Sequence, residues 1–500
     1  MTPCWLTLAL HLGLAASISN ANHACHALEK AVPGSVAVPG SAAYLEAGRY
    51  WSERQAELRP SCFFIPADTQ EVSRGMKVLT GLDTPFSVKS GGHTAFEGGS
   101  SSDAGVTIDL VRLNGIVVSE DRRTVSVGPG NRWINVSRTL DPLGLAVVGG
   151  RECDVGVGGL VLGGGISYFS GRHGWACDNV GEFEVVLSSG RAVNASASEN
   201  PDLYRALRGG GGSNWGIVTR FDLVAFEQGA LWASSLIFPA SSNGTLVSRF
   251  RELAVDGLAT DPDAHAYMVF MRNPTLGRDV VLASFYHATV PGGGGVPDVF
   301  APFQSVRGAL VNTTVVADVS TLSESIREPY GSRQTWWDTS VRLGAGSARL
   351  LEDILPLFEA LSEKLRSALG SDDVRTLLVF QPIPTNVLRQ MQKNGGNALG
   401  LHPDDGPLMI VQLAIKWDDD LVDDLVEASS AEFISSVESM AKSRQLLKGY
   451  VYMNYAGRSQ HVLERYGEQS YRRLKETANK WDPEGLLQKL WKGYFKIDGE

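Results

Sequence analysis

The chain has 500 residues, of which 43% are hydrophobic and 20% are charged, and its formal net charge is −10. This composition is ordinary for a folded globular protein and gives no sign of extended disorder. The acidic balance and the lack of a Lys/Arg-rich stripe argue against nucleic-acid binding. At roughly 100–200 residues per domain, the length suggests two to four compact units.

The N-terminus has the pattern of an export signal. Residues 5–18 form a short apolar run that is followed by the small-residue sequence Ser19-Asn20-Ala21. This pattern predicts a signal peptide over residues 1–21, but no Lys or Arg precedes the run, and a buried first helix is the alternative. No other apolar run is long enough to span a bilayer. We therefore expect a soluble, secreted protein, and four Asn-x-Ser/Thr sequons fit that route: Asn135, Asn194, Asn243 and Asn312.

Four cysteines remain if Cys4 leaves with the signal peptide, and their spacing matches no zinc pattern, so no metal site is predicted. In an oxidising compartment, Cys25 and Cys62 could link the N-terminal arm to the first strand region. Cys153 and Cys177 lie in glycine-rich segments, where they could be free and buried or paired.

The first half of the chain alternates short strands with glycine turns. Residues 22–60 are expected to form an arm with a helix at about 42–57. The predicted strands then cover 62–66, 86–89, 106–109, 124–127 and 183–187, and the predicted helices cover 71–79, 133–140 and 201–207. Asn200 and Pro201 suit the N-cap and the first position of the last helix.

From about residue 226, strands are interleaved with long amphipathic helices. Strands are predicted at 267–272, 280–287, 375–380 and 408–416, and helices at 348–369 and 421–442. This pattern predicts an α+β unit whose sheet is covered by helices on one side. The last fifty residues are expected to contain a strand at 452–455 and a helix at 459–480.

Three glycine clusters interrupt these elements. The first, Lys89-Ser90-Gly91-Gly92-His93, directly follows a predicted strand. Consecutive glycines let backbone N–H groups converge on an anion and let the main chain approach a ligand closely. From these residues alone, a surface turn with a solvated histidine is the alternative.

The other two clusters occupy residues 154–165 and 208–218. Apolar residues stand between the glycines, which indicates buried backbone rather than a polar linker. No complete G-x-G-x-x-G fingerprint and no P-loop is present, which disfavours a nicotinamide-dependent Rossmann enzyme. Three separate buried glycine loops suit a large planar ligand with a diphosphate.

Five segments together indicate a family. They are Ser90-Gly91-Gly92-His93, Val155-Gly156-Val157-Gly158-Gly159, Asn200-Pro201-Asp202-Leu203 running into Arg208-Gly209-Gly210-Gly211, Tyr452-Met453-Asn454-Tyr455, and Asp482-Pro483-Glu484-Gly485. With them the chain resembles the FAD-linked oxidases of the vanillyl-alcohol oxidase and p-cresol methylhydroxylase superfamily, above all the berberine-bridge-enzyme-like branch. The resemblance spans roughly residues 57–228 and 450–496.

The resemblance implies a fold of class α+β in two parts. Residues 22–226 and 450–500 would form a two-subdomain FAD-binding domain of the p-cresol methylhydroxylase type. Residues 227–449 would form a substrate domain, with an antiparallel sheet as a roof over the flavin and with flanking helices.

The resemblance also assigns the cofactor residues. His93 is expected to bond covalently to the 8α-methyl carbon of FAD, which raises the flavin potential and anchors the ring. The other expected cofactor residues are Ser90, Gly91, Gly92, Gly156, Gly158, Gly159, Val218 and Asn454. Some relatives add a cysteine link, but the matching position is Glu152 and Cys153 comes one residue late, so we expect a single link. Val155 occupies a position at which, by the resemblance, valine is typical of oxidases that admit oxygen to the flavin. An ordinary core valine is the alternative.

On the substrate side, Tyr455 matches the family's active-site tyrosine and is the expected base. Its reference pKa near 10 requires a nearby cation or donor for that role. Gln381 stands near the position of a catalytic carboxylate or amide in relatives, and it can only hydrogen-bond. Gln412 and Lys416 share one strand face and could reach substrate or solvent. His173 is expected to be a structural turn residue rather than a catalytic one.

The expected activity is hydride transfer from a small organic substrate, preferably a natural-product alcohol, to FAD, with reoxidation by O2 to hydrogen peroxide. Trp336 and Trp337 could form a sugar platform or plain core, so an oligosaccharide oxidase stays an alternative. A dehydrogenase with another acceptor and a non-catalytic flavin-binding protein are further alternatives. A small-molecule substrate and O2 are the expected partners, without nucleic acid or membrane, and we expect a monomer.

Overall fold

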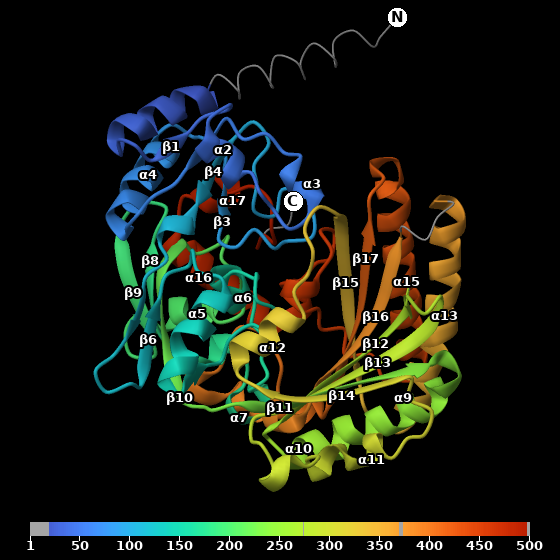
Figure 1. Ribbon diagram of the computed structural model, residues 1–500. Helices are drawn as coiled ribbons and strands as arrows, with labels where there is room; N and C mark the ends of the chain where they lie inside the picture. The colour runs from blue at the N-terminus through green and yellow to red at the C-terminus, as the bar shows by residue number, and fades with distance from the viewer. Residues whose placement is uncertain (1–19, 274, 370–373, 498–500) are drawn as a thin grey trace, which may run out of the picture.

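The computed structural model describes residues 20–273, 275–369 and 374–497, and within them the strands form three sheets (Figure 1). Almost all of the predicted signal peptide lies outside the described residues, and residues 20–31 are helical. No helix in the described ranges combines the length and the apolar character needed to cross a membrane.

The first sheet has four strands in the order β1-β2-β4-β3. Its central pairs, β2 with β4 and β3 with β4, are parallel, whereas β1 runs antiparallel to β2. A disulfide between Cys25 and Cys62 joins the helical residues 20–31 to β2, as predicted. The elements of this part are β1 (Val36–Ala37), α2 (Ala42–Ala47), α3 (Glu53–Ala56), β2 (Cys62–Phe64), α4 (Thr69–Gly81), β3 (Phe86–Lys89) and β4 (Val106–Asp109).

Helix α4 illustrates how the local sequence sets an element. Asp68 caps it by accepting a hydrogen bond from the backbone N–H of Glu71 at 2.8 Å. Val72, Met76 and Leu79 are spaced three or four residues apart and are buried together on one face. The helix extends two residues beyond the predicted range at each end.

The second sheet has six antiparallel strands, in the order β5-β6-β10-β8-β9 with β7 also paired to β10. The elements are β5 (Ile116–Val118), β6 (Thr124–Val127), α5 (Trp133–Leu140), β7 (Leu145–Val147), α6 (Val157–Leu162), α7 (Ser170–His173), β8 (Val180–Val186), β9 (Ala192–Ser196), α8 (Pro201–Leu207) and β10 (Ile217–Glu227). The predicted helices 133–140 and 201–207 are confirmed.

The third sheet has seven antiparallel strands in the order β14-β11-β13-β12-β16-β17-β15. Its strands are β11 (Leu231–Pro239), β12 (Ala264–Asn273), β13 (Arg278–His287), β14 (Val311–Ala317), β15 (Arg333–Arg342), β16 (Arg375–Ile383) and β17 (Leu408–Trp417). The helices in this part are α9 (Asn243–Glu252), α10 (Leu258–Thr260), α11 (Ala301–Gln304), α12 (Val319–Ser325), α13 (Ser347–Leu369), α14 (Thr385–Gln390) and α15 (Asp423–Ser443).

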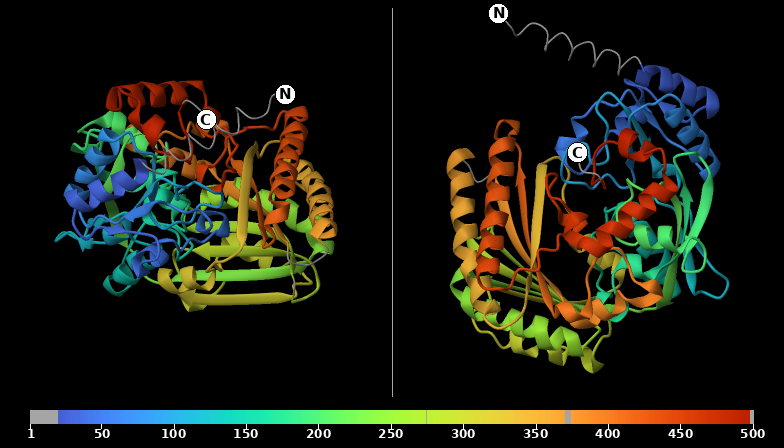
Figure 2. Two further views of the ribbon diagram at one scale, coloured as in Figure 1. Left: turned by 90° about the horizontal axis from the view of Figure 1, so that it is seen from above. Right: turned by 180° about the vertical axis from the view of Figure 1, so that it is seen from behind.

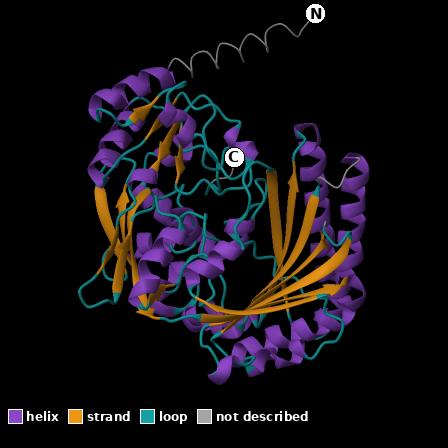
Figure 3. Cartoon of the chain, viewed as in Figure 1, coloured by secondary structure: helices purple, strands orange, loops and turns teal. Residues whose placement is uncertain are grey.

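The two faces of this sheet have different surroundings because side chains alternate along a strand. Met268, Phe380 and Leu413 belong to a core shared with α9, α13 and α15. Figure 3 shows these helices on the outer side of the sheet, while its inner side faces loops. The predicted sheet covered on one side is therefore confirmed.

The last part of the chain returns to the first two sheets. Helices α16 (Glu468–Trp481) and α17 (Leu486–Leu490) pack against the N-terminal elements, as Figure 2 shows from behind. The backbone N–H of Lys492 donates to the carbonyl of Phe86 at 2.8 Å, and Ser213 donates to the carbonyl of Phe495 at 2.9 Å. These hydrogen bonds join the C-terminal segment to parts of the first two sheets that lie far from it in the sequence.

Three local predictions need correction. The single helix at 42–57 is divided into α2 and α3, with Gly48 as the C-cap of α2. The strand at 452–455 is wrong, because Met453–Tyr455 form a 3₁₀ turn closed by the N–H of Tyr455 on the carbonyl of Tyr452. The helix at 459–480 begins only at Glu468, since Gly467 has a φ of +87°.

Asn200 is an N-cap residue whose side chain has a partner outside the helix. It occupies the N-cap position of α8, and Pro201 is the first helical residue, as predicted. Its side chain does not cap the helix and instead donates to the carbonyl of Asn194 at 2.7 Å. Its φ of +52° lies in the left-handed region that asparagine tolerates.

Candidate active site

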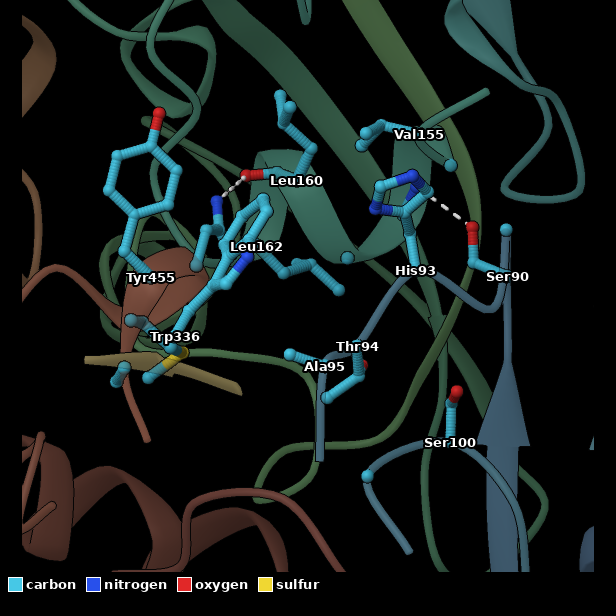
Figure 4. Close-up of a pocket in the computed structure, with 18 of the residues that line it drawn as sticks. Ser90, His93, Thr94, Ala95, Ser100, Val155, Leu160, Leu162, Trp336 and Tyr455 are labelled. Atoms are coloured by element: carbon cyan, nitrogen blue, oxygen red, sulfur yellow. Dashed lines mark hydrogen bonds between the residues drawn. The ribbon is translucent and has the colours of Figure 1, made fainter. Parts of the chain in front are cut away.

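A cavity of about 360 Å³ is lined by the glycine loops and by the inner face of the seven-stranded sheet. All of the predicted site residues line it. They are Ser90, Gly91, Gly92, His93, Val155, Gly156, Gly158, Gly159, Val218, Gln381, Asn454 and Tyr455. Figure 4 shows His93 and Val155 on one side of the cavity and Tyr455 and Trp336 on the other.

The first two glycine loops press against each other without side chains between them. A Cβ atom on Gly91 would lie 2.4 Å from the backbone nitrogen of Gly156, and one on Gly156 would lie 2.2 Å from that of Gly91. Ser90 stabilises the contact between the two loops, because its hydroxyl donates to the carbonyl of Pro129 at 2.5 Å and accepts from the N–H of Gly158 at 3.1 Å. The position of this wall is therefore set by the main chain.

His93 leaves the first loop and stacks on Trp51, with ring centroids 4.1 Å apart and planes 11° apart. Its side chain is only 7% exposed, and its Nε2 atom has no hydrogen-bond partner. Burial, followed by the charge of Arg132, lowers the pKa of His93 to about 3, so the imidazole is neutral at physiological pH. A neutral, buried imidazole keeps a lone pair on one of its ring nitrogens, which suits it to bonding with a group in the cavity.

Two charged residues lie beside this histidine. Glu152 Oε2 is 3.7 Å from His93 Nε2, and burial raises the pKa of this carboxyl group. Lys416 pairs with Glu328 and lies over the ring of Trp51, 5.9 Å from the ring centroid. Burial lowers the pKa of Lys416 to about 8.

Arg151 is the centre of the opposite end of the site, and it is not among the site residues predicted from the sequence. Its guanidinium donates to Tyr455 Oη at 2.8 Å and to Gln381 Oε1 at 2.9 Å. It also contacts His265 Nε2 at 3.0 Å and lies over the ring of Tyr267 at 5.1 Å. The sequence signal is a single arginine between Gly150 and Glu152, three residues before the second glycine cluster, and it does not reveal these partners.

The charge of Arg151 bears directly on Tyr455. Burial raises the pKa of the Tyr455 phenol above its usual value, and the guanidinium opposes that effect. The cation that a tyrosine base requires is therefore in hydrogen-bond contact with it. Trp336 packs edge-on against the same ring, with centroids 5.4 Å apart.

The sheet contributes side chains at alternate positions. Gln412 and Lys416 both line the cavity, so of the two orientations left open by the sequence, toward substrate or toward solvent, they have the first. Trp336 lines the cavity, whereas Trp337 belongs to the core on the helix side. The tryptophan pair is thus divided between the two faces, as consecutive strand residues must be.

Asn454 makes protein contacts from the cavity wall. Its Nδ2 donates to the carbonyl of Leu160 and to Tyr452 Oη, both at 3.0 Å. A Cβ on Gly163 would lie 2.1 Å from Asn454 Oδ1, so the glycine allows this close approach. Asn454 therefore links the C-terminal return to the end of α6.

Three residues considered from sequence lie away from the cavity lining. His173 stacks on Phe226 at 4.3 Å, which agrees with a structural role. Cys153 and Cys177 are free and buried, and neither lines the cavity. Burial raises the pKa of Cys153 to about 12, so its thiol is not ionised at neutral pH.

These features fit FAD. Close-packed glycine backbone leaves space that side chains would otherwise fill, and His93 offers a buried, neutral imidazole. The inner sheet face adds a separate wall with aromatic and amide groups. The fold and the site together define a flavin-dependent oxidoreductase.

The comparisons with known proteins agree. Residues 60–196 match the family model described as FAD binding domain. The chain is 33% identical over 510 residues to FAD-dependent monooxygenase FUP4 of Fusarium proliferatum, covering 98% of this chain and 97% of that protein. It is 35% identical over 463 residues to FAD-dependent monooxygenase tpcD of Cochliobolus heterostrophus, covering 90% and 88%. The chain belongs to the same family of FAD-dependent oxidoreductases as these two proteins.

Solved structures share the fold. The 6-hydroxy-D-nicotine oxidase of Arthrobacter nicotinovorans has a TM-score of 0.77 at 19% identity, covering 93% of this chain and 98% of that one. A chitooligosaccharide oxidase has a TM-score of 0.71 at 18% identity, covering 96% and 100%. At these identities the likeness concerns the fold alone.

Proposed function

We propose that this protein is a secreted oxidase that holds FAD covalently through His93 and oxidises a small, largely apolar alcohol. Residues 22–226 and 450–500 would hold the cofactor, and residues 227–449 would cover the substrate. The disulfide between Cys25 and Cys62 supports an oxidising compartment. FAD, when bound, accepts a hydride from the substrate carbon and passes two electrons to O2, which leaves as hydrogen peroxide.

The observation that carries the proposal is the contact of Arg151 with Tyr455 inside the cavity. An alcohol that loses a hydride from carbon must also lose the hydroxyl proton. Tyr455 can accept that proton as a phenolate, and the guanidinium stabilises the negative charge at Oη. Gln381 and His265 hold Arg151 in place by further contacts at 2.9 and 3.0 Å.

The cavity wall supports an alcohol with few polar groups. Four of the sheet residues that face it are apolar: Val269, Leu377, Val379 and Ala414. The uncharged polar residues of that face are Tyr267, Trp336, Gln381 and Gln412. Gln381 is already engaged with Arg151, and the Tyr267 hydroxyl with that of Tyr286. A sugar carries a hydroxyl on nearly every carbon, and each buried hydroxyl without a partner costs about 1–3 kcal/mol. This wall therefore favours a natural-product alcohol over an oligosaccharide.

Oxygen access is assigned to the Val155 side of the cavity. Val155 lines the cavity beside Gly156, and its backbone N–H is fixed by Glu152 at 2.8 Å. A valine there leaves more room than a leucine would. This supports O2 as the electron acceptor rather than a bulky carrier.

A second candidate is monooxygenation, because both curated relatives described above carry that name. The two reactions differ in the fate of oxygen. An oxidase returns both oxygen atoms as hydrogen peroxide, whereas a monooxygenase places one atom in the product and releases the other as water.

One experiment tests both proposals. Turnover of a panel of aromatic and polyketide-like alcohols under ¹⁸O2 should give one hydrogen peroxide per product and no ¹⁸O in the product. One ¹⁸O atom per product would establish the monooxygenase instead. In parallel, acid-precipitated wild-type protein should stay yellow and His93→Ala should not, whereas loss of all flavin from the wild type in acid would refute the covalent link.

A further inference from the structure

His93 and Glu152 form a pair that the proposed reaction does not use. The imidazole is fixed by its stacking on Trp51, and its Nε2 has no hydrogen-bond partner. A carboxylate oxygen, Glu152 Oε2, lies 3.7 Å from this atom. A hydrogen bond spans about 2.7–3.2 Å, so the two atoms need to approach by roughly half an ångström.

The main chain fixes the position of the carboxylate. The N–H groups of Asp154 and Val155 donate to Glu152 Oε2 at 2.7 and 2.8 Å. The N–H of Glu328 donates to Oε1 at 3.2 Å. Because backbone groups hold both oxygens, the carboxylate is anchored beside the histidine rather than free to turn away.

A neutral imidazole has one proton and two tautomers, and a partner on one nitrogen decides which form is present. A histidine that donates one N–H to a carboxylate is fixed in orientation, and its other nitrogen becomes more basic. In the described chain, Glu152 is the carboxylate within ion-pair distance of His93.

We propose that Glu152 is a positioning residue that accepts the Nε2–H of His93 and leaves the Nδ1 lone pair as the nitrogen that bonds to the flavin. This inference rests on the covalent link proposed above. Glu152 acts only through the imidazole.

The test follows the attachment of FAD to full-length protein prepared from flavin-limited cells. Samples are quenched with acid over time, and the flavin retained in the pellet is measured. The affinity for FAD before attachment is measured by fluorescence. Glu152→Gln keeps an oxygen for the N–H groups of Asp154 and Val155 but removes the charge. It should slow attachment by about 10–100-fold while the affinity for FAD stays unchanged.

Asp154→Asn is the matched control. Asp154 pairs with Arg327 at 2.6 Å and does not line the cavity, so this variant loses a neighbouring charge and should attach FAD at the wild-type rate. Attachment by Glu152→Gln at the wild-type rate would overturn the inference. Failure of Glu152→Gln to bind FAD would also overturn it, since the glutamate would then only support its loop.

Two further measurements separate this inference from the proposed function. His93→Ala that still retains covalent flavin would refute the covalent role of His93 itself. The ¹⁵N spectrum of histidine-labelled protein before attachment, assigned by the signal missing in His93→Ala, should show a protonated Nε2 and an unprotonated Nδ1. The opposite tautomer would overturn the role of Glu152 and leave the covalent link intact.

Discussion

The two walls of the cavity are built by different means. On the glycine side, main chain meets main chain, and Gly91 and Gly156 leave no room for a Cβ atom. On the sheet side, alternate side chains of β12, β16 and β17 face the cavity from a regular backbone. The first wall can change only by moving the backbone, whereas the second can change one side chain at a time.

This difference separates the requirements for cofactor and substrate. A wall of fixed backbone suits a ligand of one fixed shape, such as the cofactor. A wall of exchangeable side chains can be fitted to a particular substrate, because the sheet keeps its shape when inward side chains are replaced. Single substitutions on the two walls should therefore have effects of different kinds.

The largest effect is expected for Gly156→Ala. The added methyl would lie 2.2 Å from the backbone nitrogen of Gly91, and overpacking against backbone costs about 1–3 kcal/mol or more. We expect at least about tenfold weaker FAD binding, equivalent to about 1.4 kcal/mol, measured by flavin content and thermal unfolding. In Gly81→Ala the methyl meets no protein atom within 4 Å and lies away from the cavity, so this control should keep its flavin content and unfolding temperature. Equal behaviour of both variants would contradict the rigid-wall model.

Tyr455→Phe tests the chemistry at the meeting point of the two walls. Phenylalanine keeps the ring contacts with Trp336 and removes only the hydroxyl that Arg151 contacts. Anaerobic reduction of the flavin by substrate should slow by about 10²–10⁴-fold at unchanged flavin content. Tyr286→Phe removes a hydroxyl from a tyrosine that does not line the cavity and serves as the control. A change of less than about threefold, well below that range, would make Tyr455 only a wall of the pocket.

Arg151→Met should have a smaller effect and a specific pH signature. The guanidinium opposes the rise that burial causes in the pKa of Tyr455, so its removal should raise that pKa further. The ionisation seen in the rate of flavin reduction should move to higher pH, and the rate at neutral pH should fall about tenfold per pKa unit. Arg151→Lys keeps a charge and should shift the profile less. An unshifted profile in Arg151→Met would exclude this electrostatic role.

Val155→Leu should have the smallest effect and should act on one half-reaction. The larger side chain adds bulk beside Gly156, where oxygen access is proposed. Stopped-flow measurements should show severalfold slower reoxidation by O2, while reduction by substrate stays unchanged. A normal oxidative half-reaction would leave Val155 as an ordinary packing residue.

The sequence by itself determined features that depend on near neighbours. Helices α5 and α8 and strands β3, β4 and β6 have the predicted bounds, because the spacing of their hydrophobic residues and the residues that begin and end them are local features of the sequence. The glycine clusters could also be interpreted from local sequence, because consecutive glycines indicate that the backbone approaches another group closely, whichever part of the chain or ligand that group belongs to. The turn at Tyr452–Tyr455 was misassigned because contacts with distant residues such as Leu160, rather than local propensity, hold it.

Only the tertiary structure decided which side chains meet. Arg151 contacts Gln381 and Tyr455, which are 230 and 304 residues away in the chain. The even spacing of Gln412 and Lys416 placed them on one face, but the packing of α13 and α15 on the other face turned that face toward the cavity. Local sequence fixes which side chains share a face, whereas the burial of the apolar face against the helices decides where the other face points.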